Sequence, residues 1–156
     1  MKIVLLNAGK TRVSFVADGI QFYTSRINRY TQWDIIETAD TKHMSDIKAM
    51  QRDEAEKLLK QIQPTDFVIL LDEKGTQHGS IAFAGALQKL IESGNRRIVF
   101  VIAGAYGAHE VLLARTNEKW SLSKLTFPHQ LVRLILTEQI YRAFSIMRNE
   151  PYHHEG

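Results

Sequence analysis

The chain contains no cysteine among its 156 residues. A disulfide framework is therefore excluded, as is any zinc or iron–sulfur site built on thiolates. Apolar stretches are also short, and none approaches the roughly 20 residues that a membrane-spanning helix needs. The N-terminal run from Ile3 to Leu6 is too short for the core of a signal peptide, and no cleavage motif follows it. These absences predict a soluble, cytoplasmic protein.

A strong excess of charge of either sign is absent as well. Twenty basic and 17 acidic side chains leave a net charge of +3, which by itself indicates no nucleic-acid partner. The distribution is less even, because residues 1–30 carry five basic side chains against the single acid Asp18. That segment is compatible with a face that meets phosphates and equally with an ordinary solvated helix.

What the sequence does contain is an alternation of strand and helix signals along its length. Runs at 3–6, 33–37, 67–71 and 98–102 are typical of strands, and the last two are continuous enough to be covered on both faces. Between them, apolar residues three and four apart indicate helices. This order predicts a single α/β domain over residues 1–156 with a mostly parallel sheet.

The final helix is expected to begin at Pro128 and to run to about Met147. Its apolar side chains cover most of the circumference rather than one stripe. A helix of this kind must be buried on several sides. In a chain this small, a second copy of the protein is the simplest cover, so the sequence predicts a homodimer with this helix in the interface.

Two strand ends are candidates for ligand binding, because α/β proteins bind ligands beyond the carboxyl ends of their strands. Leu71 is followed by a predicted loop that includes Gly75, and Ile102 is followed by the small residues 103–107. Small residues let a ligand approach the backbone, whose amides can donate hydrogen bonds. The spacing matches no dinucleotide or ATP-binding loop, and ordinary strand-to-helix turns also explain it.

A third candidate segment runs from Ser121 to Gln130, directly before the last helix. It offers hydroxyl and main-chain groups beside apolar side chains, which suits a neutral aromatic ring better than a phosphate. A helix-capping segment without any ligand fits the same residues. The six histidines show no ligand spacing such as HExxH, so no metal site is predicted.

Specific strings in the chain resemble the RlmH family of methyltransferases. The matching segments are Leu71-Asp72-x-x-Gly75, 100–107, 121–133, 138–143 and Pro151-Tyr152-His153. The resemblance covers essentially the whole chain and is densest after Phe67. It implies the SPOUT fold, an α/β fold with a parallel sheet, helices on both faces and a C-terminal trefoil knot, and it also implies a homodimer.

The resemblance further implies S-adenosylmethionine (SAM) as the cofactor, held in the knot largely by main-chain groups. By motif match, the contacts fall on Leu71, Ala103, Gly104, Leu122, Ser123, Lys124, Leu125, Thr126 and Phe127. The implied substrate is N3 of a pseudouridine in 23S ribosomal RNA within the assembled ribosome, and the reaction needs no metal. Tyr152 and His153 are the candidates for orienting the base or accepting its proton. A tail that only binds RNA is the alternative.

Two positions depart from the family pattern. Ala103 stands where the family usually has glycine, which is tolerable if its φ is negative, and His154 stands where arginine is often found. Neither change removes a group that SAM binding obviously requires. Arg133 and Arg142 are interpreted as structural rather than phosphate-binding, because both stand in an otherwise buried helix.

Three other functions remain to be separated from this one. A SPOUT methyltransferase acting on tRNA is disfavoured, because no appended RNA-binding domain is evident. A non-catalytic module that binds the ribosome would keep the same fold. A receiver-type domain is disfavoured, because Leu6-Asn7-Ala8 stands where its acidic cluster would follow the first strand.

Overall fold

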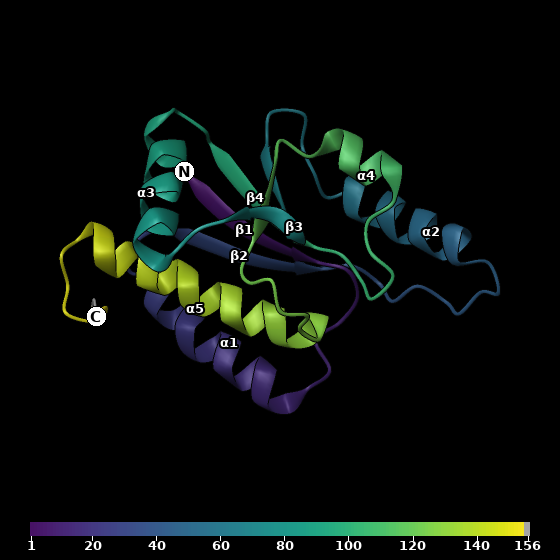
Figure 1. Ribbon diagram of the computed structural model, residues 1–156, viewed down its shortest axis with the longest axis horizontal. Coiled ribbons are helices and arrows are strands. Elements are labelled where there is room, and N and C mark those ends of the chain that lie inside the picture. The colour runs from purple at the N-terminus through teal and green to yellow at the C-terminus, as the bar shows by residue number, and fades with distance from the viewer. Residues whose placement is uncertain (155–156) are drawn as a thin grey trace.

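The computed structural model describes residues 1–154 and contains a parallel sheet flanked by helices (Figure 1). The strands are β1 (Lys2–Asn7), β2 (Gln32–Glu37), β3 (Phe67–Gln77), β4 (Arg97–Ile102) and β5 (Glu118–Ser121). The helices are α1 (Ser14–Ile27), α2 (Ile47–Leu59), α3 (Ser80–Glu92), α4 (Glu110–Arg115) and α5 (His129–Met147). The predicted α/β alternation is confirmed.

The strands stand in the order β2-β1-β4-β3-β5, and every neighbouring pair is parallel. At the end of β1, Asn7 lies opposite both Glu37 of β2 and Ile102 of β4. Three strands therefore end level with one another. All carboxyl ends face the same edge of the sheet, which is where ligands bind in such folds.

Side-chain alternation along the strands builds one apolar layer on each face of the sheet. Ile3 and Leu5 belong to the layer beneath α1, α3 and α5, whereas Val4 and Leu6 belong to the layer beneath α2 and α4. Figure 1 shows the two groups of helices on opposite sides of the strands. The prediction of helices on both faces is thus confirmed.

Strand β3 is longer than the sequence indicates. The apolar run was expected to end at Leu71 in a loop, but the strand continues to Gln77. Leu71 and Thr76 both pair with Trp120 of β5, so residues 72–75 form a bulge. A Cβ at Gly75 would lie 2.6 Å from the carbonyl carbon of Lys119. This glycine therefore permits close strand pairing and not the approach of a ligand.

Helix α5 is covered on several sides within a single chain. It packs against α1 and α3 as well as the sheet, and Leu136, Ile140 and Phe144 are buried in the shared core. Side chains such as Leu131 and Ile135 remain partly exposed. Neighbouring helices thus account for much of the apolar circumference that suggested a partner subunit, and the homodimer stays a prediction.

In residues 1–154, no helix is long and apolar enough to cross a membrane.

Candidate functional site

A cavity of about 640 Å³ opens at the carboxyl edge of the sheet. Its size falls in the roughly 300–1,000 Å³ range of small-molecule sites. The walls come from the part of β3 around its bulge, the turn after β4, the segment between β5 and α5, and the first turn of α5. Eight of the nine residues predicted to hold a cofactor line this cavity: Leu71, Ala103, Gly104, Leu122, Ser123, Leu125, Thr126 and Phe127. The ninth, Lys124, is exposed and is not among the lining residues.

Several lining residues are not among the nine that were predicted to hold a cofactor. Asp72 and Glu73 bring two carboxylates to the wall, because the bulge in β3 holds them beside β5. His129 and Val132 face the cavity from the first turn of α5. Their three-residue spacing puts both side chains on one helical face, and this signal was available in the sequence once the start of the helix was known.

Local side-chain hydrogen bonds shape the segment between β5 and α5. The Ser121 hydroxyl donates to the carbonyl oxygen of Ser123 at 2.8 Å, and the Leu125 amide donates to Ser123 Oγ at 3.0 Å. The Thr126 hydroxyl donates to Glu73 Oε2 at 3.2 Å and so joins this segment to the β3 bulge. Serine and threonine side chains commonly stabilise such irregular backbone. The wall is therefore preformed.

The turn after β4 is held from α2. The Gly104 amide donates to Glu54 Oε1 at 2.8 Å, and Gln51 hydrogen-bonds the carbonyl oxygen of Tyr106. A Cβ at position 104 would lie 2.3 Å from Glu54 Oε2, so any residue other than glycine would displace this carboxylate or the turn. Burial raises the pKa of Glu54, and the hydrogen bond from Gly104 partly opposes that rise.

Ala103, one of the two departures from the resembled family pattern, lies in the turn after β4. Among the described non-glycine residues, only Asn149 has a positive φ, so the backbone of Ala103 is unstrained. Next to this turn, a smaller cavity of about 180 Å³ shares Gly104, Ala105 and His129 with the first. Burial lowers the pKa of His129, as does the charge of Arg133, so the imidazole that lines both cavities is neutral at neutral pH.

The two predicted catalytic residues lie outside the cavity of their own chain. The Tyr152 hydroxyl donates to Glu138 Oε1 at 2.9 Å, and Arg142 donates to His153 Nδ1 at 3.1 Å. Glu138 stands roughly 13 Å along the helix axis from His129, at about 1.5 Å per residue. The tail thus folds back along the second half of α5, while the cavity adjoins its first turn.

The hydrogen bonds of this tail cluster, made of Glu138, Arg142, Tyr152 and His153, limit its chemistry. Arg142 has only N–H donors, so Nδ1 of His153 is the acceptor and its lone pair is already used. Burial, followed by hydrogen bonds with Tyr23 and Glu138, raises the pKa of Tyr152, which keeps the phenol protonated. In this arrangement the cluster is better suited to orienting a group than to removing a proton, and the catalytic role stays a prediction.

Across residues 1–154, no group of three or more histidine or acidic side chains is placed to hold a metal ion.

Comparisons with known proteins agree with this architecture. Residues 1–153 match the family described as "Predicted SPOUT methyltransferase". The chain is 42% identical to a protein of Parabacteroides distasonis, over 99% of this chain and all of that protein. It is 43% identical to one of Flavobacterium psychrophilum over the same shares, and 42% identical to one of Bacillus pumilus over 98% of this chain and 99% of that protein. All three relatives are named ribosomal RNA large subunit methyltransferase H.

A solved structure is similar in fold alone. It is a probable methylase family protein from Haemophilus influenzae, 11% identical, with a TM-score of 0.50 over 95% of this chain and 66% of that one. The sequence relatives are far closer and match end to end, which confirms the resemblance first seen in the strings after Phe67. The chain therefore belongs to the SPOUT methyltransferase family and, within it, to the group of proteins named ribosomal RNA large subunit methyltransferase H, or RlmH.

Proposed function

We propose that this chain transfers the methyl group of SAM to N3 of a pseudouridine in 23S ribosomal RNA, within assembled ribosomes in the cytoplasm. Membership of a methyltransferase family supports the reaction type, and the names of the relatives support ribosomal RNA as the substrate. The observation that carries the proposal is the cavity of about 640 Å³, where three segments distant in sequence meet at one sheet edge.

The residues around this cavity fit the chemistry of SAM. Leu71, Leu122 and Phe127 offer apolar surface for an adenine ring, and Asp72 and Glu73 offer negative charge to a molecule with a sulfonium and an ammonium group. A neutral His129 avoids placing a like charge beside that sulfonium. When bound, SAM supplies a methyl group already activated on sulfur, so the protein has to hold and align the reactants.

We further propose that the tail of one subunit completes the cavity of a second copy. Tyr152 and His153 are bound to the far half of α5 and do not line the cavity of their own chain. Exposed apolar side chains support a partner, since Phe15, Phe22 and Leu125 are 65%, 51% and 68% exposed. In that assembly Tyr152 and His153 orient the base. Residues 122–128, which lead into α5, form part of the trefoil knot that membership of the family implies.

The proposal is tested first by calorimetric titration with S-adenosylhomocysteine (SAH), which should bind once per subunit. Absence of binding would remove the cofactor assignment. Mass spectrometry of 23S ribosomal RNA from a deletion strain should then reveal one missing methyl group on a pseudouridine. Loss of a tRNA methyl group instead would favour the alternative SPOUT activity, and loss of neither would favour a non-catalytic ribosome-binding module.

A further inference from the structure

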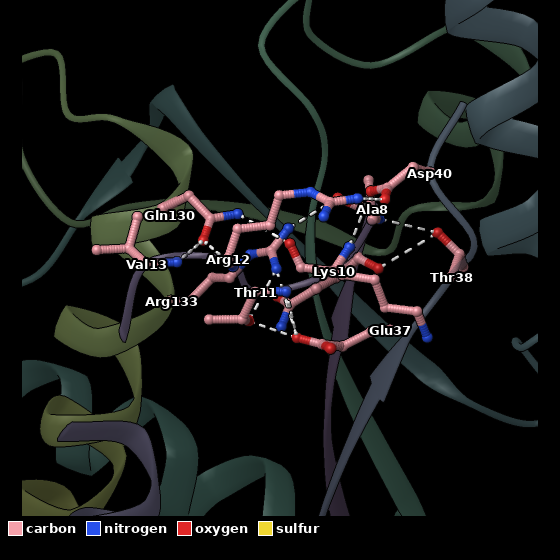
Figure 2. Close-up of polar contacts among 12 residues, drawn as sticks. Ala8, Lys10, Thr11, Arg12, Val13, Glu37, Thr38, Asp40, Gln130 and Arg133 are labelled. Carbon is pink, nitrogen blue, oxygen red and sulfur yellow. Dashed lines mark hydrogen bonds and ion pairs between the residues drawn. The ribbon is translucent and has the colours of Figure 1, made fainter. Parts of the chain in front are cut away.

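A polar cluster ties the start of α5 to the loop between β1 and α1 (Figure 2). Arg133, from the second turn of α5, is fully buried and donates to the carbonyl oxygen of Ala8 at 2.7 Å. Its other terminal nitrogen donates to Thr11 Oγ1 at 2.9 Å and lies 3.5 Å from Glu37 Oε2. We name the side chains of Arg133, Gln130, Thr11 and Glu37 the α5 clamp.

The side chain of Gln130 holds the same loop by hydrogen bonds to the main-chain groups of the loop. Its Oε1 accepts from the amide of Arg12 at 2.9 Å, and its Nε2 donates to the carbonyl oxygen of Lys10 at 3.1 Å. Glu37, the last residue of β2, accepts from the Thr11 amide at 3.0 Å and also bonds the Thr11 hydroxyl. The loop is therefore fixed between α5 on one side and β2 on the other.

The clamp is poorly arranged for stability alone. Arg133 is fully buried, yet among the residues that the structure describes it has one carboxylate within ion-pair distance and no partner for its Nε. Asn7 lies on the same face of β1 as Leu5, and its buried side-chain amide also has no partner among residues 1–154. Replacing both partners of a buried ion pair by well-packed apolar residues is often neutral or stabilising. Polar groups kept at such a cost are expected where position matters to function.

The position that the clamp sets is that of the cavity wall. Pro128, His129 and Val132 line the cavity and stand on the same two helical turns as Gln130 and Arg133. A shift of these turns relative to the sheet would therefore move the wall and the adjoining segment 122–127. We infer that Arg133 and Gln130 are positioning residues for methyl-donor binding, which act through the wall and need no contact with the donor; this inference rests on the proposed function.

The test compares the buried Arg133 with a partly buried arginine at the opposite edge of the sheet. Arg97 opens β4 at the amino edge and pairs with the buried Asp66 at 2.8 Å, away from the cavity. We expect Arg133→Met to weaken SAH binding by about tenfold or more, measured by calorimetry, and also to lower the melting temperature, because Glu37 and the carbonyl oxygen of Ala8 lose their donor. Arg97→Met should lower the melting temperature, because Asp66 is left buried and unpaired, yet bind SAH as the wild type does.

Two further variants keep the test decisive if Arg133→Met does not fold. Gln130→Ala should weaken SAH binding severalfold, and Arg133→Lys, which keeps the charge but not the fork of donors, should fall between wild type and Arg133→Met. Wild-type affinity in the Gln130→Ala and Arg133→Lys variants would overturn the inference. So would a loss of affinity in Arg97→Met that matches its loss of stability. A wild-type protein that binds no SAH would overturn the proposed function itself.

Discussion

Two arginines in opposite halves of α5 differ in how well nearby carboxylates compensate for their burial. Burial lowers the pKa of Arg133, and the carboxylates of Glu37 and Glu54 oppose this only in part. Burial acts in the same direction on Arg142, but there the hydrogen bond and charge of Glu138 outweigh it and the pKa is raised. The first arginine stands in the half of α5 beside the cavity and the second in the half that holds the tail. In the first half of α5, a buried and poorly compensated arginine holds the cavity wall. In the second half, a well-paired arginine orders the tail.

The largest effect is expected at the centre of the tail cluster. Glu138 accepts from Arg142 at 2.6 and 2.9 Å and from the Tyr152 hydroxyl, so Glu138→Gln removes the charge that orders both. Methylation of ribosomes should fall by about a hundredfold, as expected for a misplaced reacting group. SAH affinity should stay within about twofold of the wild type, because the cavity lies at the other end of the helix.

A matched control exists on α2. Arg52 and Glu56 form an exposed i,i+4 pair at 3.2 Å, and Glu56→Gln should change neither methylation nor SAH affinity. If SAH affinity fell together with methylation in Glu138→Gln, the separation of the two halves of α5 would be wrong.

Gly104→Ala should show the reverse pattern, with the cavity damaged and the tail intact. The added Cβ would lie 2.3 Å from Glu54 Oε2, so either the turn or the carboxylate must move. We expect a loss of stability of about 1–3 kcal/mol and weaker SAH binding, measured by thermal unfolding and calorimetry. Combining Gly104→Ala with Glu54→Ala should restore part of the stability, since the clash is removed. An unchanged affinity in the single variant would place this turn outside the donor site.

A smaller effect is expected where the tail is anchored. The Tyr30 hydroxyl donates to Glu150 Oε2 at 2.6 Å, and burial, followed by that bond, raises the pKa of Tyr30 from 10.0 to about 12. The folded state thus holds the phenol proton more tightly than the unfolded state. Folding stability should therefore fall as the pH rises from about 10 to about 12, and Tyr30→Phe should lack this part of the slope. Near neutral pH the variant should lose about 1 kcal/mol in urea unfolding.

Sequence reasoning reached the cavity because strand ends in a parallel sheet share one edge. Ala103 follows β4, Leu71 stands at the end of the apolar run of β3, just before its bulge, and the matched strings supplied the third segment. It could not reach the reason for Gly75, whose neighbour is the Lys119 backbone, or for Gly104, whose neighbour is Glu54, 50 positions away. The apolar pattern of α5 likewise predicted burial on several sides, but it did not indicate whether other helices of the same chain or a second subunit cover them. Arg133 is buried, as its place in an apolar helix suggested, but its partners Ala8 and Thr11 lie more than 120 positions away and could not be identified from the sequence.

The smallest effect should come from Glu54→Gln, and it separates the charge of this side chain from its hydrogen bond. Burial raises the pKa of Glu54, so the folded state binds its proton more tightly than the unfolded state. That contribution to stability is present below the ordinary pKa of 4.5 and is lost as the pH rises through the raised value. At pH 7 Glu54→Gln should therefore match or slightly exceed the wild type in melting temperature, because the oxygen of the new side-chain amide would still accept from the Gly104 amide. SAH affinity should be unchanged in Glu54→Gln and reduced in Glu54→Ala, which leaves that amide unpaired. Equal losses in both variants would mean that the cavity half of α5 and its neighbours depend on the negative charge of Glu54, and the contrast with the charge-ordered tail would disappear.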